Sequence, residues 1–162
     1  MQVTFTVNGE ERRHLVNPDE KLLDTLRSLG YTGVKRGCDE GTCGSCVVIL
    51  NGKLVNSCVM FTPTAEGASI VTIEGLGNTD NPHLLQTQFV KAAAVQCGFC
   101  TPGMILAAKV LLDANPNPTD DDIKEALDGN RCRCTGYVKI IEAIHGAAKV
   151  IRQQAGEEVT HG

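Results

Sequence analysis

The chain has 162 residues, a formal net charge of −4, eight Cys, 17 Gly and no Trp, so its length suffices for two small domains whose cores hold few aromatic rings. Its Lys and Arg residues are scattered, whereas nucleic-acid binding usually leaves a basic stripe that neutralises phosphates, so no nucleic-acid partner is expected. The N-terminal residues lack the pattern of a secretory signal and no apolar run reaches the roughly 18 residues of a membrane span, so we expect a cytoplasmic protein.

The first half of the chain has the pattern of short strands. Val3, Phe5 and Val7 alternate with polar residues, and Asn8-Gly9 follows directly. Because Asn and Gly accept positive φ at little cost, this dipeptide predicts a two-residue hairpin whose return strand covers residues 12–16.

One helix and a second hairpin follow in the same half. Residues 18–20, Pro-Asp-Glu, are typical of a helix start. The apolar face of this helix is formed by Leu22, Leu23, Leu26 and Leu29. Asn51-Gly52 predicts a turn between strands at 47–50 and 53–55, and residues 69–73 predict a last short strand. Together these elements indicate a small mixed sheet with one helix packed on it.

The second half changes to a helical period. Asn81-Pro82 predicts a cap followed by proline at the first helical position, and apolar residues then recur at helical spacing up to Gln96. Thr101-Pro102 repeats this pattern before a helix that runs to Ala114, and Thr119 is predicted to cap a third helix. The fourth helix is indicated by Ile140, Ile141, Ile144, Ala148 and Ile151. Four helices of this length predict a compact bundle.

A glycine-containing stretch separates the two halves. Residues 75–81 begin with Gly-Leu-Gly-Asn, which continues the period of neither half. We therefore expect two domains, residues 1–76 and 77–155, followed by a polar C-terminal tail at residues 156–162.

The first group of cysteines lies in the glycine-rich segment between the predicted helix and the second hairpin. Its spacing is Cys38-x4-Cys43-x2-Cys46, with Cys58 further on. Cytosolic thiols stay reduced, so a metal site is favoured over a disulfide scaffold. The spacing is that of plant-type 2Fe–2S ferredoxins, and the interleaved glycines let the backbone curl around a cluster. Zinc is the main alternative, although structural zinc sites usually pair two short CxxC-type knuckles.

The second group of cysteines, Cys97-x2-Cys100 and Cys132-x-Cys134, is less specific. Both pairs are expected at helix ends, where free N–H groups stabilise anionic sulfur. Taken alone, this group fits either zinc or an iron–sulfur centre. A redox dithiol is a further alternative, but no thioredoxin-like βαβ pattern surrounds it.

Four segments of the chain resemble one family. Residues 37–46 (GCDEGTCGSC), 56–58 (NSC), 96–104 (QCGFCTPGM) and 130–137 (NRCRCTGY) are similar to the iron–sulfur subunit of the xanthine oxidase family, the molybdenum hydroxylases. The resemblance implies an α+β fold class, in which an N-terminal β-grasp domain like a plant-type ferredoxin is followed by an all-α four-helix bundle. It also implies two 2Fe–2S clusters, with metal ligands Cys38, Cys43, Cys46 and Cys58 for the first and Cys97, Cys100, Cys132 and Cys134 for the second.

The same resemblance implies that the chain relays electrons within a complex. The second cluster would lie nearer the molybdopterin centre of a large subunit and the first nearer FAD on a medium subunit, in a heterotrimer or a dimer of heterotrimers. Gln96 would hydrogen-bond the pterin, and Cys134 would lie close to it. No residue set resembles a general acid–base pair or an activated nucleophile, so we expect an oxidoreductase subunit with no catalytic residue of its own.

Two other functions stay open at this point. A free-standing two-cluster ferredoxin would exist as a soluble monomer that serves several partners. A zinc-stabilised interaction module would be colourless and free of iron.

Overall fold

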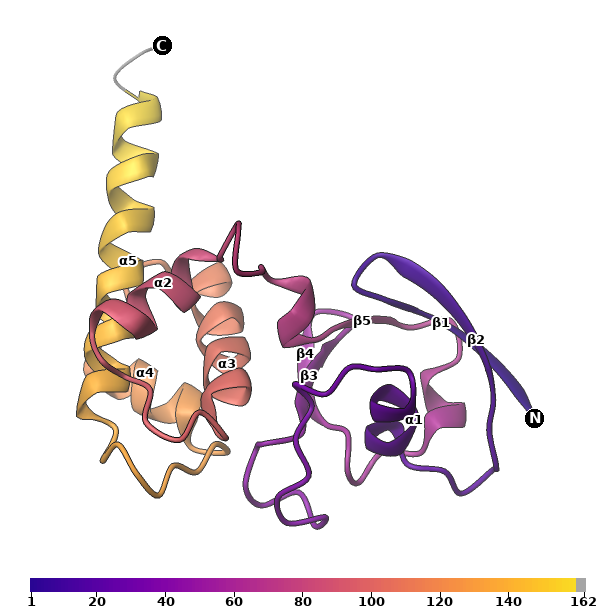
Figure 1. Cartoon of the computed structure of the whole chain (residues 1–162). Helices are drawn as coiled ribbons and strands as arrows, with labels where there is room; N and C mark the ends of the chain where they lie inside the picture. The colour runs from indigo at the N-terminus through magenta and orange to yellow at the C-terminus, as the bar shows by residue number, and fades with distance from the viewer. Residues whose placement is uncertain (160–162) are drawn as a thin grey trace.

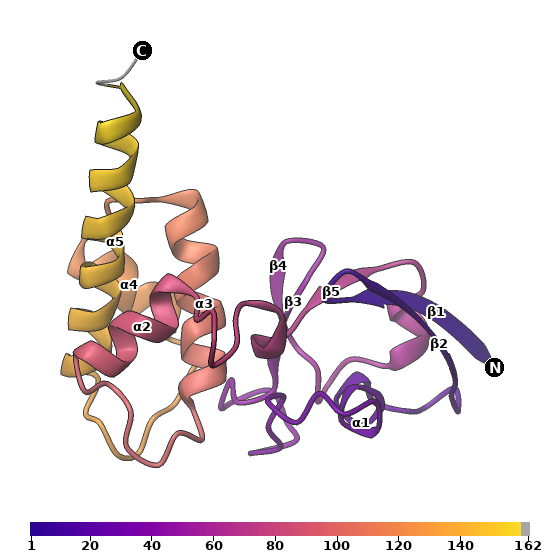
Figure 2. The ribbon, with the colours of Figure 1, turned by 45° about the horizontal axis from the view of Figure 1, so that its top comes forward.

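The computed structural model describes residues 1–159, with side chains as far as residue 156. The chain forms a sheet lobe and a helical lobe that lie side by side (Figures 1 and 2). The sheet lobe contains β1 (Gln2–Val7), β2 (Glu10–Leu15), α1 (Leu22–Ser28), β3 (Val47–Leu50), β4 (Lys53–Asn56), the 3-10 turn η1 (Thr62–Ala65), β5 (Ser69–Val71) and the 3-10 turn η2 (Ile73–Gly75). The helical lobe contains α2 (Leu84–Lys91), α3 (Thr101–Ala114), α4 (Asp120–Leu127) and α5 (Val138–Val159). Within residues 1–159, no helix combines the length and the apolar character that crossing a membrane requires.

The five strands form one mixed sheet in the order β2-β1-β5-β3-β4. β1 and β5 are parallel at its centre, and the other neighbouring strands are antiparallel. Both predicted hairpins are confirmed: Asn8 and Gly9 have φ of 53° and 85°, and Asn51 and Gly52 have φ of 48° and 81°, as a type I′ turn requires. The last strand ends at Val71, earlier than predicted, because η2 follows it. With α1 crossing one face, this is the expected β-grasp arrangement.

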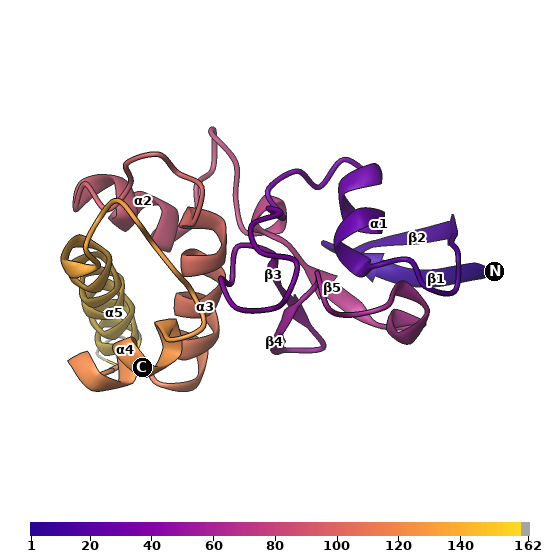
Figure 3. The same ribbon diagram turned by 90° about the horizontal axis from the view of Figure 1, so that it is seen from below.

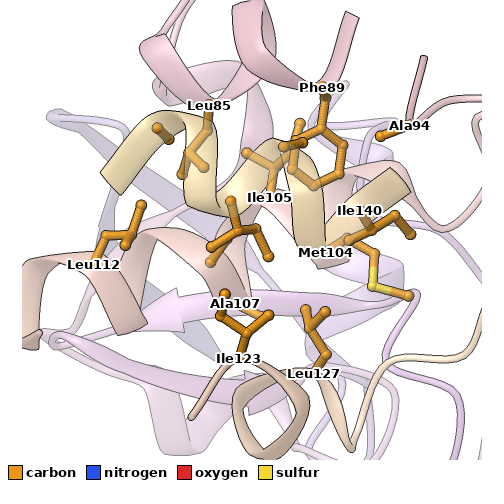
Figure 4. Packing of buried hydrophobic residues seen from close by; sticks show 14 of the residues in the cluster. Leu85, Phe89, Ala94, Met104, Ile105, Ala107, Leu112, Ile123, Leu127 and Ile140 are labelled. Carbon is orange, nitrogen blue, oxygen red and sulfur yellow. The ribbon is translucent and has the colours of Figure 1, made fainter. Parts of the chain in front are cut away.

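Each lobe has its own apolar core. In the sheet lobe, Val3 and Phe5 of β1 are almost fully buried against the leucine face of α1. In the helical lobe, all four helices contribute buried side chains, among them Phe89, Met104 and Ile123 (Figure 4). The predicted four-helix bundle is therefore confirmed. α5 also includes residues 156–159 of the expected polar tail, whereas residues 160–162 lie outside the described residues.

The predicted start of α2 at Asn81-Pro82 is wrong, because a histidine caps this helix. His83 Nδ1 accepts a hydrogen bond from Leu85 N at 3.2 Å, and the side chain of Gln86 accepts one from His83 N at 2.8 Å. Asn81 belongs to the preceding turn, where its N–H donates to Asn78 Oδ1 at 2.8 Å.

The end of α2 also differs from the prediction. Ala93 has a φ of 53°, which a helix cannot accommodate, and α2 accordingly ends at Lys91. Gln96 therefore lies in the loop between α2 and α3 and not on a helix.

Strand β3 is covered on both faces because it lies where the lobes meet. Val48 packs into the core of the sheet lobe, whereas Val47 and Ile49 contact Leu106 of α3. Figure 3 shows α3 alongside β3. This apolar contact packs the helical lobe against the sheet.

Protonation of His83 should destabilise the start of α2. The pKa of His83 lies below its ordinary value of 6.5, because burial disfavours the charged ring and Lys109 repels it. The folded state therefore binds fewer protons than the unfolded state just below pH 6.5. Stability from this residue is complete above that pH and is lost as the pH falls toward the folded-state pKa.

The variant His83→Asn keeps a capping acceptor that does not titrate. We expect the melting temperature of the wild type, measured anaerobically, to fall more steeply than that of the variant between about pH 7.5 and about pH 5.5. Parallel profiles would contradict this role of His83.

Candidate metal centres

The first group of cysteines occupies a tight loop and the end of a strand. Cys38, Cys43 and Cys46 lie between α1 and β3, and Cys58 lies just after β4. The loop is closely packed, since a Cβ on Gly37 would lie only 2.7 Å from Cys43 Sγ. The fold thus brings together all four residues of this group.

The sulfurs of the first group form two neighbouring pairs. Hydrogen bonds lower the pKa of Cys38 to about 6, and the main-chain N–H of Glu40 has the largest effect. The thiol of Cys43 is one of the other donors to Cys38. Burial, and then interaction with Cys46, raises the pKa of Cys58 to about 12. One pair is therefore Cys38 with Cys43, and the other is Cys46 with Cys58.

The second group lies at one end of the helical lobe. Cys100 is the N-cap of α3, Cys97 precedes it, and Cys132 and Cys134 lie on the connection between α4 and α5. The outer pair is Cys97 and Cys134, which are exposed and whose Sγ atoms are 3.6 Å apart. The inner pair is Cys100 and Cys132, which interact and are partly buried.

Hydrogen bonds stabilise negative charge on Cys132. Thr135 donates to Cys132 Sγ from Oγ1 at 3.0 Å and from its main-chain N at 3.4 Å. Burial is the largest single influence and opposes this effect, but the donors together outweigh it and lower the pKa of Cys132. The pKa of Cys100 is raised to about 12 by burial and then by its neighbour Cys132. The surroundings of the inner pair thus favour the thiolate form at Cys132 and disfavour it at Cys100.

Tyr137 holds the main chain at Cys132. Its Oη accepts from Cys132 N at 2.9 Å and donates to Asn130 O at 3.3 Å. The sequence pattern assigns no role to Tyr137, Asn130 or Thr135. Only their places within the segment 130–137 indicate that they belong to the site.

The cysteine sulfurs of both groups, and the hydrogen-bond donors around them, fit a 2Fe–2S cluster. Such a cluster is held by four thiolates on two irons, and hydrogen-bond donors to sulfur tune it. Each group offers two sulfur pairs, and Thr42 N donates to Cys38 Sγ at 3.3 Å much as Thr135 does to Cys132. Among the side chains that the structure describes, up to residue 156, no group of three or more His, Cys, Asp or Glu residues is arranged to hold a single metal ion.

Gln96 lies beside the outer pair. It is exposed and directly precedes Cys97, and the fold brings Cys134 to the same surface. Two apolar neighbours, Val95 and Phe99, are 39% and 45% exposed. Exposed apolar side chains gathered around a functional group are typical of a surface that contacts a partner.

The two groups are joined by a main-chain contact that the sequence did not predict. Arg131 N donates to Cys43 O at 2.9 Å, although the two residues belong to different lobes. Cys132 follows Arg131 directly, so one hydrogen bond links the cysteine loop of the first group to a cysteine of the second.

Comparison with known families assigns an iron–sulfur domain to each lobe. The family described as a 2Fe-2S iron-sulfur cluster binding domain matches residues 5–69. The family described as a 2Fe-2S binding domain matches residues 72–145.

Curated relatives include separate small subunits of nearly the same length. The chain is 51% identical over 148 residues to the nicotinate dehydrogenase small FeS subunit of Eubacterium barkeri. This match covers 91% of this chain and 94% of the relative. It is 42% identical to the nicotine 6-hydroxylase small subunit of Paenarthrobacter nicotinovorans, covering 96% and 94% of the two chains.

Solved structures show the same fold. The aldehyde oxidoreductase from Desulfovibrio desulfuricans ATCC 27774 has a TM-score of 0.91 and 46% identity, and the match covers 94% of this chain but only 17% of that one. The quinoline 2-oxidoreductase from Pseudomonas putida 86 has a TM-score of 0.89 and 43% identity, with 94% and 96% of the two chains covered.

The fold and the two cysteine groups define an electron-transfer protein with two 2Fe–2S centres. The chain belongs to the 2Fe–2S subunits of the molybdenum hydroxylase family and is the iron–sulfur part of an oxidoreductase. The predicted family, fold class and electron-transfer role are thereby confirmed. The zinc-stabilised module and the free-standing ferredoxin are not favoured.

Removing the hydroxyl of Thr135 should lower the reduction potential of the second centre. Thr135→Val keeps the main-chain donor but loses the Oγ1 bond to Cys132 Sγ, and hydrogen bonds to sulfur stabilise the reduced cluster. We expect an EPR-monitored redox titration to show a more negative midpoint for the second centre, with iron content unchanged. The first centre serves as the internal control, and a shift of both midpoints would contradict this assignment.

Proposed function

We propose that each cysteine group ligates one 2Fe–2S cluster and that each sulfur pair ligates one iron. In the first centre, the irons are held by Cys38 with Cys43 and by Cys46 with Cys58. In the second centre, they are held by the outer pair, Cys97 with Cys134, and by the inner pair, Cys100 with Cys132. The observation that carries this proposal is the pairing of the sulfurs within each group. When bound, each cluster accepts and releases one electron.

The proposed partners are a large molybdopterin-binding subunit and a medium FAD-binding subunit, assembled as a heterotrimer or a dimer of heterotrimers. The large subunit would cover the exposed surface at Gln96, Cys97 and Cys134, where Gln96 hydrogen-bonds the pterin. The FAD subunit would lie nearer the first centre, where Val59 and Phe61 are exposed close to Cys58 in the sequence. The exposure of the outer pair supports this orientation, because a cluster edge at the surface shortens the distance to a docked cofactor.

We also propose that residues 1–76 and 77–155 are the two functional domains. The two family matches, 5–69 and 72–145, lie on either side of this boundary and support it. We place the complex in the cytoplasm, where cysteines such as the eight free ones of this chain stay reduced.

The relay role does not depend on the substrate of the complex. The relatives that this chain matches over nearly their whole length are named for nicotinate, nicotine and quinoline, and the quinoline enzyme's chain also shares its fold. A subunit that passes electrons without contacting the substrate explains why one chain type serves these different enzymes.

Metal analysis combined with low-temperature EPR tests the cluster assignment. The full chain, reduced with dithionite, should contain about four irons and give two distinct S = 1/2 signals that integrate to about two spins. Zinc in place of iron in either half, or a single signal, would overturn it.

The variant Gln96→Ala tests the contact with the large subunit. Both clusters should keep their iron and their EPR signals, because Gln96 is exposed and is not a ligand. In the purified complex, we expect the splitting of the molybdenum EPR signal by the reduced second cluster to weaken. Gln153→Ala, an exposed glutamine on α5, is the matched control, and equal splitting in both variants would contradict a role for Gln96.

A further inference from the structure

The tip of the first cysteine loop contains a peptide unit that is hydrogen-bonded at both ends. This unit joins Gly41 to Thr42, and its N–H, on Thr42, donates to Cys38 Sγ at 3.3 Å. Its carbonyl oxygen, on Gly41, accepts a hydrogen bond from Asn56 Nδ2 at 3.1 Å. Because a trans peptide is planar and its N–H and C=O point in opposite directions, a donor that holds the oxygen also aims the N–H at the sulfur.

Burial does not fix the orientation of this peptide, because the loop tip is open to solvent. Asp39, Glu40 and Thr42 are exposed, and Gly41 has a φ of 79°, which glycine adopts at little cost. A loop of this kind keeps one orientation when a neighbouring element holds it. Asn56 supplies that contact from outside the loop.

The main chain around Asn56 belongs to the ordered sheet. Asn56 is the last residue of β4 and pairs with Val47 of β3. Its carbonyl oxygen accepts from Val59 N at 3.2 Å. The next residue, Ser57, donates to Cys46 O from its main-chain N at 3.4 Å and from its hydroxyl at 2.7 Å. The side chain of Asn56 therefore extends to the loop from a well-anchored position.

The contact with Gly41 O is the main one that the Asn56 amide makes. The other atom of this amide, Oδ1, lies 3.9 Å from Cys46 Sγ, which is too far for a strong hydrogen bond. Gly41 also faces a second sulfur, since burial raises the pKa of Cys58 and the main-chain N–H of Gly41 opposes this effect. Holding Gly41 thus positions a donor for each of the two sulfur pairs of the first group.

We propose that Asn56 is a positioning residue that aims the Thr42 N–H at Cys38 and thereby raises the reduction potential of the first centre. The inference rests on the proposed function, in which Cys38 and its three partners hold a 2Fe–2S cluster. Hydrogen bonds from N–H groups to sulfur stabilise the reduced, more negative form of such a cluster. The bond from Asn56 also polarises the peptide, which strengthens its N–H as a donor.

Pulsed EPR on the full chain labelled with ¹⁵N-threonine tests the direction of this N–H. Thr42 is the one threonine of the loop 37–46, and Thr135 N donates to Cys132 Sγ of the second group at 3.4 Å. After reduction with dithionite, each centre should show a ¹⁵N coupling from its own threonine. In Asn56→Ala, we expect the coupling at the first centre to fall several-fold. The coupling at the second centre should stay unchanged and serves as the internal control.

The reduction potential provides a second measurement. Asn56→Asp keeps the size of the side chain but replaces the Nδ2 donor with a charged oxygen, which repels Gly41 O. We expect a redox titration to show a more negative midpoint for the first centre and no shift for the second. Asn117→Asp, at an exposed asparagine in the loop after α3, is the matched control for the added charge and should leave both midpoints unchanged.

The outcomes separate the role of Asn56 from the proposed function. A wild-type ¹⁵N coupling of Thr42 in Asn56→Ala, or an unshifted midpoint in Asn56→Asp, would overturn the role of Asn56. Loss of the first centre from both variants would overturn it as well, because a positioning residue leaves all four ligands able to bind iron. If one variant keeps the first centre, its own measurement decides the question. A wild-type chain whose first cysteine group gives no 2Fe–2S signal would instead overturn the proposed function.

Discussion

The close main-chain contact between the Cys43–Gly44 turn and residues 129–131 is the constraint on which the arrangement of the two lobes depends. Each lobe has its own core, and the apolar contact of Val47 and Ile49 with Leu106 is not directional. The main-chain contact is directional and admits no side chain at Gly44 or Gly103. It therefore fixes the orientation of one cysteine group relative to the other.

Two opposing influences, hydrogen bonds to sulfur and burial away from water, set the pKa of the thiols in both groups. Where N–H or O–H donors reach a sulfur, as at Cys38 and Cys132, the pKa of the thiol falls. Where burial dominates, as at Cys58 and Cys100, the pKa rises to about 12. Each group thus contains thiols that must release protons before they can bind iron, which couples cluster assembly to pH.

The second group has two functional sides. Its outer pair, Cys97 and Cys134, is exposed next to Gln96 and apolar side chains, which suits contact with a partner subunit. Its inner pair lies against the helical core, and Cys132 adjoins the contact with Cys43. The exposed and the buried side of the second group therefore face different surroundings, solvent on one side and the first group on the other.

Much of the fold follows from local sequence because its strongest features are local. The Asn-Gly hairpins need only two residues with positive φ, and the leucine face of α1 needs only helical spacing. The start and end of α2 were mispredicted, because His83 is an unusual capping residue and Ala93 adopts a positive φ that its residue type does not indicate. Local rules therefore fail where tertiary contacts select a less common conformation.

The spacing of the first four cysteines by itself favoured a 2Fe–2S centre over zinc, because ligand spacing along a tight loop is a property of the sequence. Family resemblance, not spacing, decided between zinc and iron in the second group. Only the tertiary structure decided which sulfurs are neighbours, which edge of the second group is exposed, and that Arg131 reaches Cys43. These contacts join segments that are far apart in the chain, and their geometry depends on how the two lobes pack, which no local pattern specifies.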